Sequence, residues 1–222
     1  MSSLIGDRLE EIRQKIPTNV RLVAVTKTVS VERIRAAYAA GIRDFGENRV
    51  NEAISKQEQL QDLSDISWHF IGHLQTNKAK KALQHFDWIH SLDSLKLARR
   101  LNALAAELPN KPKVCLQVKI LSDPNKYGWE VRDLLADLPE LDRCSNLDIQ
   151  GLMTILPLGL SESETLATFK STAELAEKIA SQNWPNLKMN QLSMGMSGDY
   201  LAAIAAGATM IRLGRIIFGE RS

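Results

Sequence analysis

A lysine stands where a buried strand is expected to end. The stretch RLVAVTK, residues 21–27, carries four apolar side chains directly to Lys27, although lysine is among the residues least often buried. Burial disfavours the charged form of lysine and leaves a nucleophilic amine able to attack an aldehyde. The alternative is a strand-end lysine whose charged head extends into solvent. The residues around Lys27 leave both interpretations open.

Two further segments are candidates for binding an anion. In LSMGMSGDYLAAIAAG, residues 192–207, small residues follow an expected strand and precede an expected helix. Free backbone N–H groups and the positive end of the helix dipole would therefore face the anion. RLGR, residues 212–215, follows the eighth expected strand. Loops after the seventh and eighth strands of barrel enzymes frequently bind phosphate. The alternative is an ordinary turn that needs glycine for its backbone geometry.

Arg212 lies on the expected inward face of the last strand. It could donate to a ring nitrogen, pair with phosphate or neutralise a buried carboxylate, and its chemistry leaves these roles equally open. A lysine nucleophile, a phosphate-binding turn and an inward arginine together indicate one cofactor class. Pyridoxal 5′-phosphate (PLP) needs an aldehyde partner, a phosphate clamp and a group at its pyridine nitrogen.

The histidines and cysteines form no metal or redox motif. His69 and His73 have the i,i+4 spacing of zinc ligands on a helix, but their segment WHFIGH is typical of a strand and lacks the glutamate of HExxH. We therefore expect no metal, a core position for His69 and a site position for His73. Cys115 and Cys144 are expected to be buried free thiols. So few cysteines indicate a reducing compartment, by default the cytoplasm.

Short apolar runs alternate with helical patterns along the chain. The expected strands are 21–26, 43–47, 67–72, 87–92, 113–120, 147–154, 190–195 and 209–214. Eight strand–helix repeats in this length predict an α/β fold, a single (β/α)8 TIM barrel with helices outside. An open doubly wound sheet is the alternative, but no glycine-rich dinucleotide fingerprint follows the first strand. No flexible linker and no block of like charges divides the chain. Residues 1–222 are therefore expected to form a single domain, with no second domain.

Several helices carry recognisable N-terminal caps. The expected caps are Ser30 for helix 31–40, Asp93 for helix 94–107, and Ser161 with Glu164 as a capping box for the helix that follows. A further helix is expected after Ser197, ending at Gly207.

Alternation within the strands predicts which side chains face the barrel interior. In residues 113–120 the four aliphatic side chains share one face, which should turn to the helices, so Cys115 and Gln117 point inward. The same parity turns Ser193 and Arg212 inward. The interior is therefore expected to be partly polar.

Other polar residues follow the carboxyl ends of the first three strands. Lys27 and His73 lie at the ends of the first and third strands, and Asn48 lies just beyond the second. In barrel enzymes this end carries the reactive groups. We therefore expect one site at the carboxyl mouth of the barrel.

Composition excludes several classes of partner. The formal charge is +2, from 28 basic and 26 acidic residues, which gives no overall field to attract nucleic acid or anionic lipid. No apolar stretch approaches the ~20 residues that a membrane span needs. Residues 1–16 lack the layout of a secretory signal and are expected to form an amphipathic helix. We expect neither nucleic acid nor membrane as a partner.

Motifs along nearly the whole chain resemble the pyridoxal-phosphate homeostasis protein family (YggS/PROSC family), which is similar to the N-terminal barrel of alanine racemases. The motifs are LVAVTKT (22–28), FGENRVNE (45–52), WHFIGHLQTNK (68–78), KYG (126–128), GLMTI (151–155), LSMGMSGDY (192–200) and GATMIRLGRIIFG (207–219). Several long motifs in a fixed order are far more specific than a lone glycine pattern.

The resemblance implies a barrel of the PLP fold type III kind and a role for each matching residue. Lys27 would hold PLP covalently as a Schiff base, the internal aldimine, with Asn48 and His73 beside the ring. The phosphate and ring-nitrogen end of the cofactor would meet Ser193, Met194, Gly195, Arg212 and Gly214.

The resemblance also implies a cytoplasmic monomer that keeps PLP and amino-acid or keto-acid pools in balance with little or no catalysis. Its expected partners are PLP and, beyond it, PLP-dependent apo-enzymes or a regulatory protein. The alternative is a PLP-dependent amino-acid racemase. Two-sided proton transfer needs two positioned groups, and only Lys27 is evident, so no catalytic residue is assigned.

Overall fold

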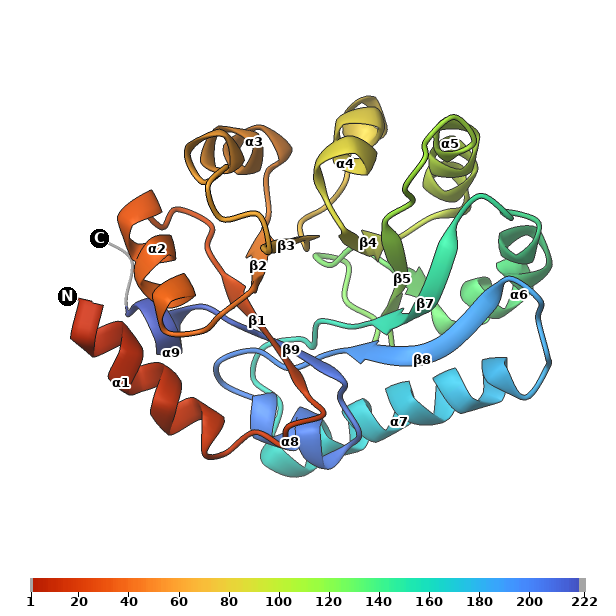
Figure 1. Ribbon diagram of the computed structural model, residues 1–222. Coiled ribbons are helices and arrows are strands. Elements are labelled where there is room, and N and C mark those ends of the chain that lie inside the picture. Colours follow the sequence, from red (N-terminus) through yellow and green to blue (C-terminus); the bar gives the residue numbers. More distant parts are fainter. Residues whose placement is uncertain (1, 220–222) are drawn as a thin grey trace.

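The computed structural model describes residues 2–219 and consists of parallel strands ringed by helices (Figure 1). The strands are β1 (Arg21–Val25), β2 (Asp44–Glu47), β3 (Ser67–Phe70), β4 (Trp88–Leu92), β5 (Lys113–Lys119), β6 (Trp129–Glu130), β7 (Asp148–Met153), β8 (Leu187–Ser193) and β9 (Met210–Leu213). They pair in the order β4-β3-β2-β1-β9-β8-β7-β5, and β4 pairs in turn with β5. This last pairing closes the barrel, whereas the two-residue β6, which was not predicted, pairs alongside the end of β5 and is not part of the ring.

Closure of the ring confirms the expected barrel and rules out the open doubly wound sheet, in which two strands would keep a free edge. Every strand pair is parallel. The carboxyl ends of all strands therefore meet at one mouth, as a common site requires.

Helices connect successive strands and cover the outside of the barrel (Figure 1). They are α1 (Ser2–Arg13), α2 (Val31–Ala39), α3 (Val50–Gln59), the 3₁₀ helix η1 (Thr76–Lys78), α4 (Ala79–His85), α5 (Leu95–Ala105), α6 (Val131–Asp142), α7 (Glu162–Ala180), α8 (Tyr200–Ala205) and α9 (Arg215–Phe218). Helix α1 precedes the first strand and lies beside α2 and α9 in Figure 1. No helix among residues 2–219 has the length and apolarity needed to cross a membrane.

The helix caps match the expectation in part. The Ser161 hydroxyl accepts from Glu164 N, and the Glu164 carboxylate accepts from Ser161 N, which confirms the capping box of α7. Ser30 occupies the N-cap position of α2, but its side chain makes no capping hydrogen bond. The prediction for Asp93 is wrong: Ser94 caps α5 by accepting from Leu97 N.

Several other boundaries differ from the expectation by one to three residues, and the differences around β8 and α8 concern the proposed site. Strand β8 begins at Leu187 rather than at residue 190. Helix α8 begins at Tyr200 with Asp199 at its N-cap, not directly after Ser197. In the turn between them the Asp199 carboxylate accepts from Met196 N at 2.5 Å, and this local bond delays the start of the helix.

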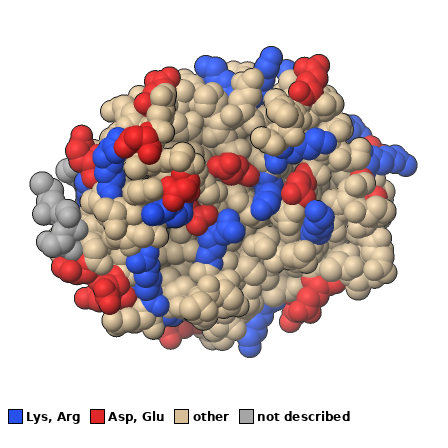
Figure 2. All heavy atoms as spheres, viewed as in Figure 1, with Lys and Arg blue, Asp and Glu red and all other residues tan. Residues whose placement is uncertain are grey.

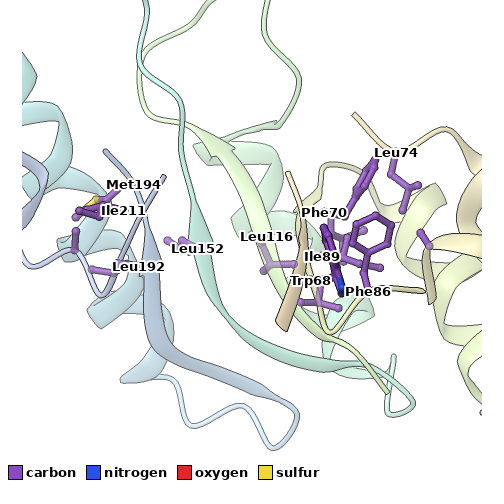
Figure 3. Close-up of a cluster of buried hydrophobic side chains, with 14 of the residues drawn as sticks. Trp68, Phe70, Leu74, Phe86, Ile89, Leu116, Leu152, Leu192, Met194 and Ile211 are labelled. Atoms are coloured by element: carbon purple, nitrogen blue, oxygen red, sulfur yellow. The ribbon is translucent and has the colours of Figure 1, made fainter. Parts of the chain in front are cut away.

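Buried side chains form an outer layer between the strands and the helices and a smaller layer inside the barrel. The outer layer includes Phe70, Ile89 and Leu116 from three neighbouring strands, which lie together in Figure 3. The inner layer consists of Trp88, Cys115, Met153 and Met210, with Ile155 packed against it. Cys115 therefore points inward and Leu116 outward, as the alternation predicts. Both cysteines of the chain are buried free thiols, as expected.

Acidic and basic side chains alternate over the face of the molecule drawn in Figure 2. The net charge is only +2, and the charged side chains on that face form no large patch of a single sign. This distribution gives no support for a nucleic-acid surface there.

Candidate functional site

Lys27 lies two residues beyond the end of β1 and is partly buried. The residue after it, Thr28, has φ 62°, a left-handed conformation that is uncommon for a β-branched residue. Thr28 N donates to Glu52 Oε1 at 2.7 Å, and this bond holds the turn in place. The lysine is thus presented on a fixed turn at the carboxyl mouth.

A buried lysine on α3 supports the same turn. Lys56 Nζ donates to the main-chain oxygen of Thr26 and lies 2.7 Å from both Glu47 Oε1 and Glu52 Oε1. The Thr26 hydroxyl also donates to Glu47 Oε1, at 2.6 Å. Burial raises the pKa of Glu47, against the hydrogen bonds from Lys56 and Thr26, which lower it. The residues on either side of Lys27 are therefore tied to one ionic cluster.

The ionic cluster of Glu47, Glu52 and Lys56 was not predicted from the sequence. Its one local signal is the i,i+4 spacing of Glu52 and Lys56 on a helix. That spacing usually marks an exposed pair, whereas Lys56 is only 8% exposed.

Asn48 and His73 line one open pocket of about 560 Å³ near the carboxyl ends of β2 and β3. The side-chain oxygen of Asn48 is buried and has no hydrogen-bond partner among the described residues. His73 Nδ1 lies 2.8 Å from Asp93 Oδ2. This bond explains the wrong cap prediction, because the Asp93 carboxylate turns to His73 instead of to the helix.

The imidazole ring of His73 stacks on Tyr127, with ring centroids 3.6 Å apart and an angle of 9° between the planes. Tyr127 lies in the loop between β5 and β6 and is 56% exposed. Tyr127 belongs to the KYG motif, for which the sequence predicted no role in the site. The stack orients the imidazole at the rim of the site.

Arg212 is buried inside the barrel, with 3% of its surface exposed. Its Nη1 donates to Ser193 Oγ at 2.7 Å, and its Nη2 donates to the main-chain oxygen of Thr154 at 2.9 Å. Burial lowers the pKa of Arg212 to about 10, so it stays charged at neutral pH. Among residues 2–219 it forms no salt bridge, but the partly buried carboxylate of Asp199 interacts with it electrostatically.

The turn after β8 requires glycine at its bend. Gly195 has φ +94°, and a Cβ on it would come within 2.6 Å of Ala203 Cβ. The Met194 side chain packs in the outer core near Ile211 (Figure 3), and its N–H donates to Met210 O. Met194 therefore faces the helices rather than the mouth.

Gly214, the N-cap of α9, brings the end of β9 close to β1. A Cβ on Gly214 would lie 3.4 Å from the carbonyl oxygen of Val25. The segment 212–214 thus runs directly beside the strand that leads to Lys27.

The predicted site residues lie at or near the carboxyl ends of five adjacent strands, β8, β9, β1, β2 and β3. His69 is fully buried in β3, as expected, and contributes to the interior rather than to the mouth. No group of three or more His, Cys, Asp or Glu side chains in the described part of the chain could hold a metal ion.

This barrel and this arrangement of residues define the class of protein. Residues 3–222 match the family model of the alanine racemase N-terminal domain. An alanine racemase of Clostridium difficile 630 has the same fold, with a TM-score of 0.81 over 99% of this chain and 57% of its own. At 16% identity, this likeness concerns the fold alone.

Within that class, the chain belongs to the pyridoxal phosphate homeostasis protein family. It is 54% identical over 211 residues to the Synechocystis protein of that name, covering 95% of this chain and 96% of the relative. It is 39% identical over 233 residues to the Escherichia coli K12 protein of the same name, covering 98% and 97%. The family resemblance expected from the motifs is therefore confirmed.

Two solved structures of PipY from Synechococcus elongatus PCC7942 are also similar to this chain. They have TM-scores of 0.93 without PLP and 0.92 with PLP bound, at 52% and 51% identity. Each comparison covers 97% of this chain and 100% of PipY.

Proposed function

We propose that this chain binds PLP and acts in the intracellular homeostasis of PLP and of amino and keto acids, with little or no catalysis. The observation that carries the proposal is the PLP-bound structure of PipY, at 51% identity and a TM-score of 0.92. Its relatives in Synechocystis and Escherichia coli are named for the same role. Similarity to racemases supports only the fold.

The residues at the carboxyl mouth fit this cofactor. Arg212 is a buried cation whose electrostatic partner, Asp199, makes no direct salt bridge with it, and burying a charge is costly. The buried oxygen of Asn48 likewise has no partner within residues 2–219. A ligand with polar and anionic groups would offset both costs.

Each predicted site residue has a proposed role. Lys27 would hold the PLP aldehyde as a Schiff base, with release of water, and Asn48 and His73 would flank the ring. The phosphate and ring-nitrogen end would meet Ser193, Met194, Gly195, Arg212 and Gly214, with Met194 contributing its backbone because its side chain is packed in the core.

Arg212 is compatible with weak catalysis, although the resemblance implies such an arginine in racemases as well, so it does not separate the two functions by itself. When bound, PLP supplies an aldehyde and an electron-accepting ring. A guanidinium has only donors, so next to the ring nitrogen it would disfavour protonation there. An unprotonated ring accepts electrons less well.

We further propose that the protein is a cytoplasmic monomer that exchanges PLP with PLP-dependent apo-enzymes or acts through a regulatory protein. The two buried free thiols support a reducing compartment.

The first test is visible absorbance. Purified protein mixed with PLP should gain a visible absorption band, and Lys27→Ala should lose it. Lys80→Ala, which removes an exposed lysine on α4, is the matched control and should keep the band. After borohydride reduction, mass spectrometry should locate the cofactor on the peptide that contains Lys27. A colourless wild type, or label on another lysine, would contradict the proposal.

The second test concerns turnover. The PLP-loaded protein is incubated with single-enantiomer amino acids in heavy water. We expect negligible deuteration at Cα, because only one proton-transfer group is proposed and racemisation needs two. Appreciable deuteration or racemisation would support the racemase alternative.

A further inference from the structure

A line of hydrogen-bonded side chains crosses the barrel interior from the proposed site to the opposite mouth. Arg212 Nη1 donates to Ser193 Oγ at 2.7 Å, and Ser193 Oγ lies 2.7 Å from His90 Nδ1. His90 Nε2 lies 2.9 Å from His69 Nδ1, and His69 Nε2 lies 2.9 Å from Asp44 Oδ1. We call these five residues the interior array.

The interior array spans the depth of the barrel. Ser193 is the last residue of β8, at the carboxyl mouth, whereas Asp44 is the first residue of β2, at the opposite mouth. Ser193, His90 and His69 are all 0% exposed. The Asp44 side chain is 21% exposed and is paired with Arg21. The array thus connects the proposed site to solvent-exposed charges at the far end.

The aspartate end sets the direction of the bonds through the two neutral histidines to Ser193, and the arginine end sets the direction of its own bond to Ser193. Arginine can only donate, and an ionised aspartate can only accept. The Ser193 oxygen therefore accepts from Arg212, and its proton goes to His90 Nδ1. His90 then donates from Nε2 to His69 Nδ1, and His69 donates from Nε2 to Asp44.

With both rings neutral, the aspartate end fixes each histidine in one tautomer, protonated on Nε2. The arginine end agrees with this direction but does not impose it, because a hydroxyl has two acceptor positions. Burial lowers the pKa of His69 and holds that of His90 well below its usual value, which keeps both rings neutral. Ser67 Oγ, 3.3 Å from His69 Nε2, is a second and longer acceptor for the same proton and leaves the tautomer unchanged.

We propose that His90 is a positioning residue of the PLP site. By accepting the Ser193 proton, it holds the Ser193 oxygen toward Arg212, and His69 and Asp44 keep the His90 ring in the tautomer that this requires. The inference rests on the proposed function, because Ser193 and Arg212 are the residues proposed to meet PLP. None of His90, His69 and Asp44 belongs to the predicted site.

The positioning role has a specific physical consequence. Without an acceptor at the position of His90 Nδ1, the buried hydroxyl of Ser193 would have to turn its proton elsewhere. Arg212 would then lose one of the two contacts that orient its guanidinium. A hydrogen bond to a charged group contributes enough that its loss should weaken ligand binding about tenfold.

The first experiment measures the tautomers without cofactor. The chain has four histidines, so their side-chain nitrogen resonances can be assigned by single substitutions in isotope-labelled protein. At neutral pH, His69 and His90 should both carry their proton on Nε2. A proton on Nδ1 of either ring would overturn the array. This result does not depend on whether the protein binds PLP.

The second experiment compares PLP affinity and the visible band in three variants of His90. Asparagine can place its amide oxygen where Nδ1 lies, so His90→Asn should stay within about threefold of wild type. His90→Leu offers no acceptor, and His90→Gln reaches the Nε2 position instead. Both should bind PLP about tenfold more weakly and shift the band.

Controls separate the possible outcomes. His85→Leu changes a histidine on α4, outside the barrel, and should bind as wild type does. If His90→Leu does not fold, the comparison of the Asn and Gln variants still decides. Equal affinity of these two variants would overturn the positioning role. Failure of wild type itself to bind PLP would instead refute the proposed function, while the tautomer result would stand.

Discussion

At the scale of single residues, the interior histidines are the least expected feature of this barrel. His69 and His90 are fully buried and hydrogen-bonded to each other, in a fold whose interior is usually filled by branched apolar side chains. Neutral imidazoles can fill this space because each has one donor and one acceptor to satisfy. Their burial makes stability depend on pH.

Acidification is expected to destabilise the protein below about pH 6.5. Burial lowers the pKa of both His69 and His90 in the folded state, whereas the unfolded chain takes up these protons near its usual value of about 6.5. The unfolded state therefore binds more protons as pH falls, and stability present above that pH is lost. The slope should approach about 1.4 kcal/mol per pH unit for each histidine.

Urea unfolding at pH 7.5, 6.5 and 5.5 measures this dependence. Glu47 and Asp199 act in the opposite direction, because burial raises the pKa of each. Wild type and His90→Asn both contain Glu47 and Asp199, so the difference between their pH slopes reports the histidines alone. The variant should lose about half of the pH dependence of unfolding that the two histidines contribute. Identical slopes for the two proteins would contradict the prediction.

At the scale of elements, the turn after β1 depends on the cluster that α3 contributes. The Lys56 ammonium lies between Glu47, whose side chain is fully buried, and Glu52, and it also binds the Thr26 carbonyl. Removing the cation leaves a buried carboxylate unpaired. We expect Lys56→Met to lower the free energy of unfolding by about 3–5 kcal/mol.

A double variant tests the cause of this loss. Glu47→Gln removes the unpaired charge, so the pair Lys56→Met and Glu47→Gln should recover at least half of the lost stability in chemical unfolding. Lys80→Met, an exposed change on α4, should have no measurable effect. If the double variant is no more stable than Lys56→Met alone, loss of packing rather than of charge pairing is responsible.

At the scale of the whole molecule, closure of the ring makes the barrel interior accessible only when strands separate. Cys115 lies in the inner layer with Trp88, Met153 and Met210 and is 0% exposed. Burial raises the pKa of its thiol to about 12, so almost no thiolate is present at pH 8. Cys115 should therefore react with thiol reagents only after global unfolding.

Thiol labelling in the Cys144→Ser variant isolates this signal, because Cys115 is then the one cysteine left in the sequence. At pH 8 the labelling rate should rise with urea as steeply as global unfolding does. Rapid labelling that does not depend on urea would show that the barrel opens locally.

Local periodicity in the sequence determined the main features of this barrel. The number of separate apolar runs in the sequence determined the number of strands in the ring. Parity determined that Cys115, Ser193 and Arg212 face inward. Strand ends determined which residues gather at the mouth. Each of these depends on a few consecutive residues, so the sequence alone was sufficient.

The tertiary structure alone decided which polar groups become partners. Ser193 and His90 are 103 positions apart in the chain yet share a hydrogen bond. Asp93 binds His73, which lies in the loop after β3, rather than capping the helix beside it. Ser193 on β8 and His90 on β4 belong to strands that do not pair with each other, so they meet only across the interior of the closed barrel. The spacing of the strands predicts a closed barrel but not which side chains meet inside it, because those contacts depend on the packing of all the strands at once.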